Sequence, residues 1–204
     1  MGRISDARER LMAASTELTW QKGYNAVTVD AICERAGVKK GSFYHFFESK
    51  AALAIASMEN AWQTRTRPIL DAAFSVSHPP LERLKLYFEG LYQRELEMRK
   101  TGGCVLGCPY FSLGMESGGL DPEVWHASQR YVKRKHRYLE SAIRDAQAEG
   151  QIDISSVEEA LQGLETLMEG ALARSRVQND PEPMRELYGQ ALRLLGTKPP
   201  VAKT

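Results

Sequence analysis

Side chains that could bind a polyanion are concentrated between residues 39 and 50, in the stretch KKGSFYHFFESK. Its lysines carry the charge that binds phosphate, and its Ser, Tyr and His side chains can form hydrogen bonds with base edges. Lys39, Lys40 and Lys50 are accompanied by one acidic residue, Glu48, so the stretch is basic although the net charge of the chain is only +1. Because local charge placement governs attraction to a polyanion, this stretch predicts a surface that binds nucleic acid.

Two cysteines form the second group with chemical potential. Cys104 and Cys108 are four residues apart, a spacing that would place both thiols on one face of a helix, but Gly107 and Pro109 disfavour regular helix there. Three interpretations remain open: a metal site, although no third Cys or His lies close in the sequence; burial as small apolar side chains; or a reactive thiol. No metal site is predicted, and Cys33 is expected in a core.

Two short helices joined by a turn should position the basic stretch. Apolar residues of the first helix recur at the i, i+3, i+4, i+7 spacing of one face, at Val29, Ile32, Cys33 and Ala36. Thr28 can cap this helix and Gly37 can end it. The second helix follows Val38 and turns three phenylalanines inward, Phe43, Phe46 and Phe47. The pattern predicts a helix-turn-helix whose second helix exposes the polar side chains.

Residues 28–50 resemble the DNA-binding segment of the TetR/AcrR family of bacterial transcriptional regulators. The matching residues are Thr28, Val29, Ile32, Ala36, Gly37, Val38, Lys40, Gly41, Tyr44, Phe46, Lys50 and Leu53. The chain departs from the family at Lys39, where Ser or Thr is usual, at Ala51, where an acidic residue is common, and at Phe47, where a polar residue is frequent. The departure at Lys39 leaves the cap of the second helix without its usual hydroxyl.

The resemblance implies a double-stranded DNA operator as partner. The implied DNA-binding residues are Thr28, Lys39, Lys40, Gly41, Ser42, Tyr44, His45 and Lys50. Among them the lysines would hold phosphates, with hydrogen bonds added by Thr28 and Tyr44. Candidates for contact with base edges are Ser42, Tyr44 and His45.

The rest of the chain predicts an all-α fold. Further helices are expected over residues 5–22, 50–74 with a kink or break at Pro68, 80–100, 122–149, from Ser155 or Ser156 onward, and 181–195. The expected organisation is a three-helix DNA-binding head over residues 1–48, a helical effector-binding and dimerisation body over 49–196, and a flexible tail over 197–204. About nine helices are expected in all, and no strand pattern is found.

Composition limits the class of protein. The chain has 204 residues, of which 43% are hydrophobic, and this supports a folded core. There is no uncharged apolar run of about 18 residues, which argues against a membrane span. The N-terminus carries charges and no signal-peptide pattern, so a cytoplasmic protein with reduced thiols is expected.

The family resemblance also implies a homodimer through the last two helices and a small-molecule effector of unknown identity. Candidate residues of the effector pocket are Trp62, Phe88, Tyr92, Cys104, Cys108, Tyr110, Phe111, Met115, Trp125, Tyr131 and Met168. The GC-x-x-G stretch at 103–107 resembles a TetR subgroup with a cysteine at the start of the sixth helix, some of whose members sense electrophiles. A helix N-terminus at Cys104 would favour the thiolate.

Two functions are therefore compared. The first is a DNA-binding regulator, interpreted as a repressor released from a palindromic operator by an effector or by cysteine modification. The second is a thiol-based redox protein or enzyme using Cys104 and Cys108. The sequence has no paired catalytic His and no Gly-rich cofactor loop, so it predicts no cofactor and favours the regulator over the enzyme.

Overall fold

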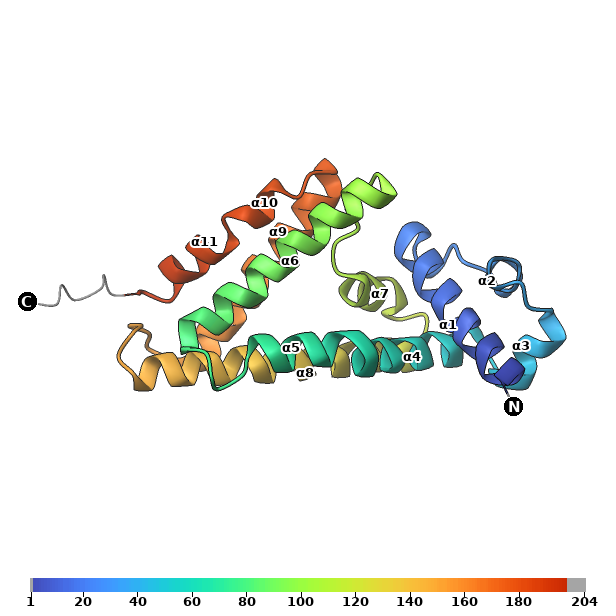
Figure 1. Cartoon of the computed structure of the whole chain (residues 1–204), viewed down its shortest axis with the longest axis horizontal. Coiled ribbons are helices and arrows are strands. Elements are labelled where there is room, and N and C mark those ends of the chain that lie inside the picture. The colour runs from blue at the N-terminus through green and yellow to red at the C-terminus, as the bar shows by residue number, and fades with distance from the viewer. Residues whose placement is uncertain (1, 198–204) are drawn as a thin grey trace, which may run out of the picture. The chain divides into compact units, whose positions relative to one another are not determined.

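The computed structural model describes residues 2–197, with side chains from Asp6 onward. All regular elements within this range are helices, which confirms the expected all-α class (Figure 1). The chain forms two compact units. The first contains the described residues up to Pro68 together with Pro109–Lys133, and the second contains Ile69–Cys108 and the described residues from Arg134 onward. Except for Thr197, the tail predicted over 197–204 lies outside the described residues.

Three helices form the N-terminal part of the first unit. They are α1 (Gly2–Lys22), α2 (Val29–Ala36) and α3 (Lys40–Phe46). The hydroxyl of Thr28 accepts a hydrogen bond from the backbone N–H of Ala31, and Gly37 ends α2 in the left-handed conformation, as the sequence predicted. The helix-turn-helix is therefore confirmed.

Aromatic side chains of α3 hold this head together. Phe43 has no exposed surface, Phe47 is buried and Phe46 is half-buried, all in one cluster with Leu11 and Ile32. Complete burial of a phenylalanine contributes about 1.5–3 kcal/mol relative to leaving it exposed. Cys33 is buried in the same cluster, as expected.

The helix expected over 50–74 is present but changes its hydrogen-bonding pattern along its length. It consists of α4 (Lys50–Ala61), a π-helical turn η1 (Trp62–Thr66) and α5 (Arg67–Ala73). Ser49 caps α4 by accepting from the backbone N–H of Ala52. Pro68 lacks an N–H and its ring crowds the carbonyl one turn earlier, and the wider π turn precedes it directly. The expected disturbance at Pro68 thus takes the form of a π turn.

Two further helices begin at prolines. They are α7 (Pro109–Ser117), in the first unit, and α8 (Pro122–Ala148), which starts in the first unit and continues into the second. Lys135 of α8 is buried and pairs with Glu169, and His136 pairs with Glu165. These two basic residues of α8 therefore take part in packing within the second unit.

The second unit contains α6 (Pro80–Gly102), α9 (Val157–Gln178), α10 (Glu182–Arg185) and α11 (Leu187–Leu194). Ser156 caps α9, and α10 and α11 pack against both α6 and α9 (Figure 1). The prediction of a single helix over 181–195 is wrong. The backbone leaves the helical region at Glu186, which has a φ of −88° and a ψ of 2° and separates α10 from α11. α10 is only four residues long, and Pro183 lies in its first turn, where a residue without a backbone N–H is tolerated.

Candidate nucleic-acid interface and thiol segment

One face of α3 carries the polar residues predicted to bind DNA. The exposed residues are Lys39, Lys40, Gly41, Ser42, Tyr44 and His45. The ring of Tyr44 is 55% exposed, while the neighbouring Phe43 is fully buried. A Cβ atom added at Gly41 would meet no other atom within 4 Å, so the backbone here is open to close approach by a partner. The helix is thus anchored on one side and free on the other.

The two lysines at the start of α3 are not equivalent. Lys39 occupies the N-cap position and makes no side-chain capping hydrogen bond, as expected for a residue without a hydroxyl. Lys40 pairs with Asp30 of α2 at 2.8 Å, and the hydrogen bond and charge of Asp30 raise the pKa of Lys40. Both partners are exposed, so this ion pair is weak enough to exchange for a phosphate.

Lys50, predicted as a phosphate contact, is engaged within the protein. Its ammonium donates to the backbone carbonyl oxygens of Tyr24 and Val27, at 2.9 and 3.0 Å. It also lies 4.1 Å from the centre of the Tyr24 ring. Its charge is directed to the loop that precedes α2.

The candidate effector residues divide between the two units. In the first unit Tyr131 stacks on Tyr110 with ring centres 3.9 Å apart and meets the edge of Trp62 at 5.3 Å. These three rings form one cluster. The remaining candidates of this unit are exposed to solvent, namely Phe111, Met115 and Trp125.

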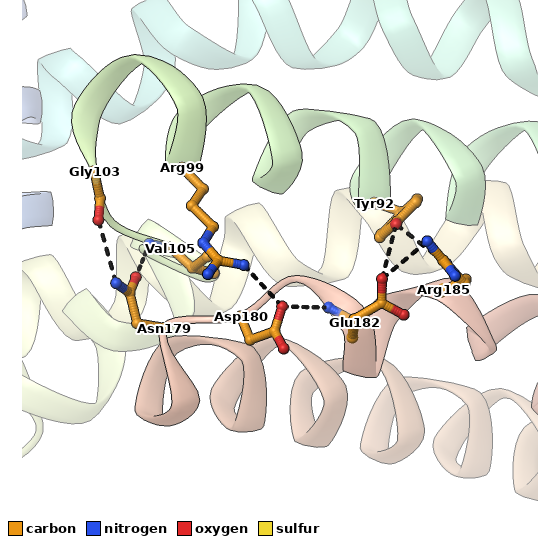
Figure 2. A network of polar contacts seen from close by, with 8 residues as sticks. All are labelled: Tyr92, Arg99, Gly103, Val105, Asn179, Asp180, Glu182 and Arg185. Carbon is orange, nitrogen blue, oxygen red and sulfur yellow. Dashed lines mark hydrogen bonds and ion pairs between the residues drawn. The ribbon is translucent and has the colours of Figure 1, made fainter.

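Candidates of the second unit lie in different surroundings. Phe88 and Met168 are buried, and the sulfur of Met168 accepts a hydrogen bond from Tyr87 at 3.5 Å. Tyr92 is at the surface, where its hydroxyl contacts Glu182 and Arg185 (Figure 2).

A small, shallow pocket, partly open to solvent, is found within the first unit. It lies between α1, α4 and α7 and is lined by Ser15, Thr16, Thr19, Ala54, Ser57, Met58, Pro109, Tyr110 and Leu113. Tyr110 is its only member among the predicted effector residues. Sequence patterns did not indicate this pocket, because its lining comes from three helices distant in the chain.

The predicted helix start at Cys104 is wrong. Cys104 lies just beyond the C-terminal end of α6, and α7 begins only at Pro109. Gly107 adopts a φ of +69°, and a Cβ atom there would stand 3.3 Å from the carbonyl oxygen of Leu172 in α9. The six residues 103–108, called here the thiol segment, are therefore non-helical, and Cys104 is not activated by a helix N-terminus. Both of its thiols are half-buried.

Asn179 holds the first half of the thiol segment (Figure 2). Its side-chain oxygen accepts from the backbone N–H of Val105 at 2.9 Å, and its amide nitrogen donates to the carbonyl of Gly103 at 3.2 Å. These two bonds lie on either side of Cys104. Asn179 ends α9 with a φ of +50°, a left-handed conformation that Asn tolerates better than most residues.

The second half of the segment is held from α6. The carboxylate of Glu95, which has no exposed surface, accepts from the backbone N–H of Gly107 at 3.2 Å and pairs with Arg94 at 2.6 Å. Next to Asn179, Asp180 pairs with Arg99 at 3.0 Å (Figure 2). Sequence reasoning missed Glu95 and Asn179; an Asn before Asp-Pro was a recognisable helix end, but its contact with residue 105 was not.

The described residues contain neither a candidate metal site nor a helix that could cross a membrane. No group of three or more His, Cys, Asp or Glu side chains there could hold a metal ion. Among the helices of residues 2–197, none combines the length and the apolar character that crossing a membrane requires.

A buried-core helix-turn-helix with an exposed polar face on its second helix defines a DNA-binding regulator of the helix-turn-helix class. Residues 11–56 match the family of "Bacterial regulatory proteins, tetR family", and residues 80–190 match "Tetracyclin repressor-like, C-terminal domain". The chain belongs to the TetR family of transcriptional regulators.

Individual relatives agree with this assignment. The chain is 34% identical over 183 residues to the transcriptional regulator AcuR of Cereibacter sphaeroides, covering 87% of this chain and 80% of AcuR. It is 23% identical to the repressor NemR of Escherichia coli, covering 94% and 95%. The crystal structure of a regulatory protein TetR from Rhodobacter sphaeroides superposes with a TM-score of 0.80 at 32% identity, over 92% of this chain and 98% of that one.

Proposed function

We propose that this regulator is a cytoplasmic repressor whose α3 enters the major groove of a palindromic operator. The observation that carries the proposal is the exposed face of α3 with Lys39, Ser42, Tyr44 and His45. Phosphate contacts are assigned to Lys39 and Lys40, and base contacts to Ser42, Tyr44 and His45. Thr28 uses its hydroxyl oxygen to cap α2 and keeps its proton for a phosphate.

A homodimer through α9 and α10–α11 completes the proposal. One helix-turn-helix contacts few base pairs, whereas a two-fold dimer presents two recognition helices to successive turns of DNA. Release would follow from a small molecule bound to the helical body or from modification of a cysteine. Either event acts by binding one of two states more tightly, and a difference of about 1–3 kcal/mol is typical.

The experiment is a DNA-binding titration on the intergenic region upstream of the protein's own gene, with and without a mild thiol-reactive electrophile. Wild type should bind tightly and lose affinity as salt rises. Tyr44→Ala should weaken binding by about 5- to 150-fold, because a base contact contributes about 1–3 kcal/mol. Gln21→Ala, an exposed position on α1, is the matched control.

Release by the electrophile in wild type but not in Cys104→Ser would assign the switch to Cys104. Release in both would leave Cys104 with a packing role, and release in neither would favour a reversible ligand. Equal affinity of Tyr44→Ala and wild type would contradict the assigned contact face.

A thiol-based redox protein is the second candidate, favoured by one observation. Cys104 and Cys108 are half-buried and lie in a non-helical segment, where a backbone without helical hydrogen bonds can adjust. This candidate predicts catalytic turnover of a disulfide substrate that Cys104→Ser abolishes. Turnover that persists when Tyr44 is replaced, together with the absence of operator binding, would favour it over the repressor.

A further inference from the structure

The loop between α1 and α2 is held from several directions within the first unit. Lys50, at the first position of α4, bonds two carbonyl oxygens of this loop, those of Tyr24 and Val27. Val27 directly precedes Thr28, whose hydroxyl caps α2. Lys50 therefore ties the residue before the N-cap of α2 to the first turn of α4.

Tyr24 links the same loop to the start of α8. Its hydroxyl donates to the carboxylate of Asp121 at 2.8 Å, and the residue is only 3% exposed. Burial and the charge and hydrogen bond of Asp121 raise the pKa of Tyr24 well above its ordinary value. The phenol thus stays protonated and remains a donor throughout the physiological range.

Glu116, near the end of α7, provides the third attachment. Its carbonyl oxygen accepts from the side-chain amide of Asn25 at 3.1 Å, and its carboxylate accepts from the backbone N–H of Asn25 at 3.3 Å. A Cβ atom on Gly23 would stand 2.8 Å from this carboxylate, and Gly23 has a φ of +87°. The positive φ favours glycine here, and a side chain at this position would also displace the carboxylate of Glu116.

Two nearby carboxylates, those of Asp121 and Glu116, partly offset the effect of burial on the charge of Lys50. Burial lowers the pKa of Lys50, while the negative charges of Asp121 and Glu116 oppose that shift. Lys50 is half-buried, with its ammonium on two carbonyl oxygens and one aromatic face. An ammonium held in this way is poorly placed to replace the counterion of a phosphate.

We propose that Lys50, Tyr24, Asp121 and Glu116 form an anchor that positions α2 and α3 for DNA. The anchor residues are positioning residues, and Lys50 raises operator affinity through the loop of residues 23–28. The inference rests on the proposed binding of DNA by α3.

Salt dependence separates a positioning lysine from a lysine that binds phosphate. When a phosphate is no longer neutralised, the slope of log affinity against log salt falls in magnitude by about 0.9. Lys39→Met should therefore reduce both affinity and slope. Lys50→Met and Tyr24→Phe should weaken operator binding at least tenfold and leave the slope unchanged, with helicity and dimerisation unaltered. Tyr24→Phe removes only one hydroxyl group, so it can test the anchor even if Lys50→Met fails to fold.

Amide hydrogen exchange tests the anchor without DNA. Exchange of the backbone amides of residues 25–32 should be at least tenfold faster in Lys50→Met and Tyr24→Phe than in wild type, and unchanged in Lys39→Met. The proposal is overturned if Lys50→Met lowers the salt slope as much as Lys39→Met, or if Tyr24→Phe matches wild type in both measurements. If wild type binds no operator, the proposed function fails, while the exchange rates still decide whether the anchor exists.

Discussion

Lysines of the same short stretch have different surroundings, and these surroundings separate their roles. Lys39 is exposed and makes no cap, Lys40 shares Asp30 with α2, and Lys50 turns back to two carbonyl oxygens. A charge contributes to polyanion binding when it is hydrated and mobile before the complex forms, because the gain comes from releasing counterions. Lys39 meets that condition most fully of the three.

Phe43 provides the test of packing at the scale of a single residue. Phe43→Ala removes a fully buried ring from the head and should lower the free energy of unfolding by about 3–5 kcal/mol. The control, Phe46→Ala, truncates a half-buried ring that packs against the same cluster and should cost clearly less. Urea denaturation followed by circular dichroism measures both, and equal decreases would contradict the packing described for α3.

At the scale of elements, the ends of helices determine where the proposed DNA-binding residues and the two cysteines lie. α3 has no side-chain cap and only seven residues, so its stability comes from burial of Phe43 and Phe47 more than from local hydrogen bonds. The thiol segment is likewise non-helical, and its backbone is held by side chains of other elements: Asn179 at the end of α9, and Arg94 and Glu95 of α6. Contacts from other elements replace regular secondary structure in both places.

Asn179 should control access to Cys104. Asn179→Gly keeps a residue that tolerates positive φ but removes both hydrogen bonds to the thiol segment, each worth about 0.5–1.5 kcal/mol net. The segment should open more often, and alkylation of Cys104 by a maleimide should be about tenfold faster by mass spectrometry.

Two controls accompany this labelling experiment. Cys33 is buried in the head, and burial raises the pKa of its thiol, so its labelling should stay slow in every variant. Val177→Ala, at an exposed position of α9, should leave the labelling of Cys104 unchanged. An unaltered rate in Asn179→Gly would show that these bonds do not limit access to the thiol.

At the scale of the whole molecule, the chain forms two compact units and passes from one to the other at three places. Two of these lie inside helices, after Pro68 in α5 and after Lys133 in α8, and the third lies between Cys108 and Pro109, where the thiol segment meets α7.

The proposed dimer is tested at Gly170 of α9. A Cβ atom there would meet nothing within 4 Å in the single chain, so Gly170→Arg should fold and even gain about 1 kcal/mol of helix stability. If α9 forms the dimer interface, the introduced arginine should separate the subunits and lower operator affinity at least tenfold.

Sedimentation equilibrium measures the oligomeric state of that variant. Gly90→Arg, at an equally open position on α6, is the control and should remain dimeric. A dimeric Gly170→Arg would exclude α9 at this position from the interface and move the search to other surfaces.

The sequence by itself determined the local features of this protein. Apolar spacing and the residues Thr28 and Gly37 located α2, the phenylalanines located the buried side of α3, and the polar residues between them located its exposed side. Such features depend on neighbours within one or two helical turns, and they were sufficient for the fold class and the family.

Only the tertiary structure decided what Lys50, Asn179 and Tyr24 do. Lys50 bonds residues 23 and 26 positions away, Asn179 holds a residue 74 positions away, and Tyr24 meets Asp121 across 97 positions. A helical pattern specifies which face of a helix is apolar, but it does not specify which residue of another helix will meet it. Those partners are set by the packing of helices on one another, so only the structure showed that the ammonium of Lys50, a predicted phosphate contact, bonds two carbonyl oxygens of the loop before α2.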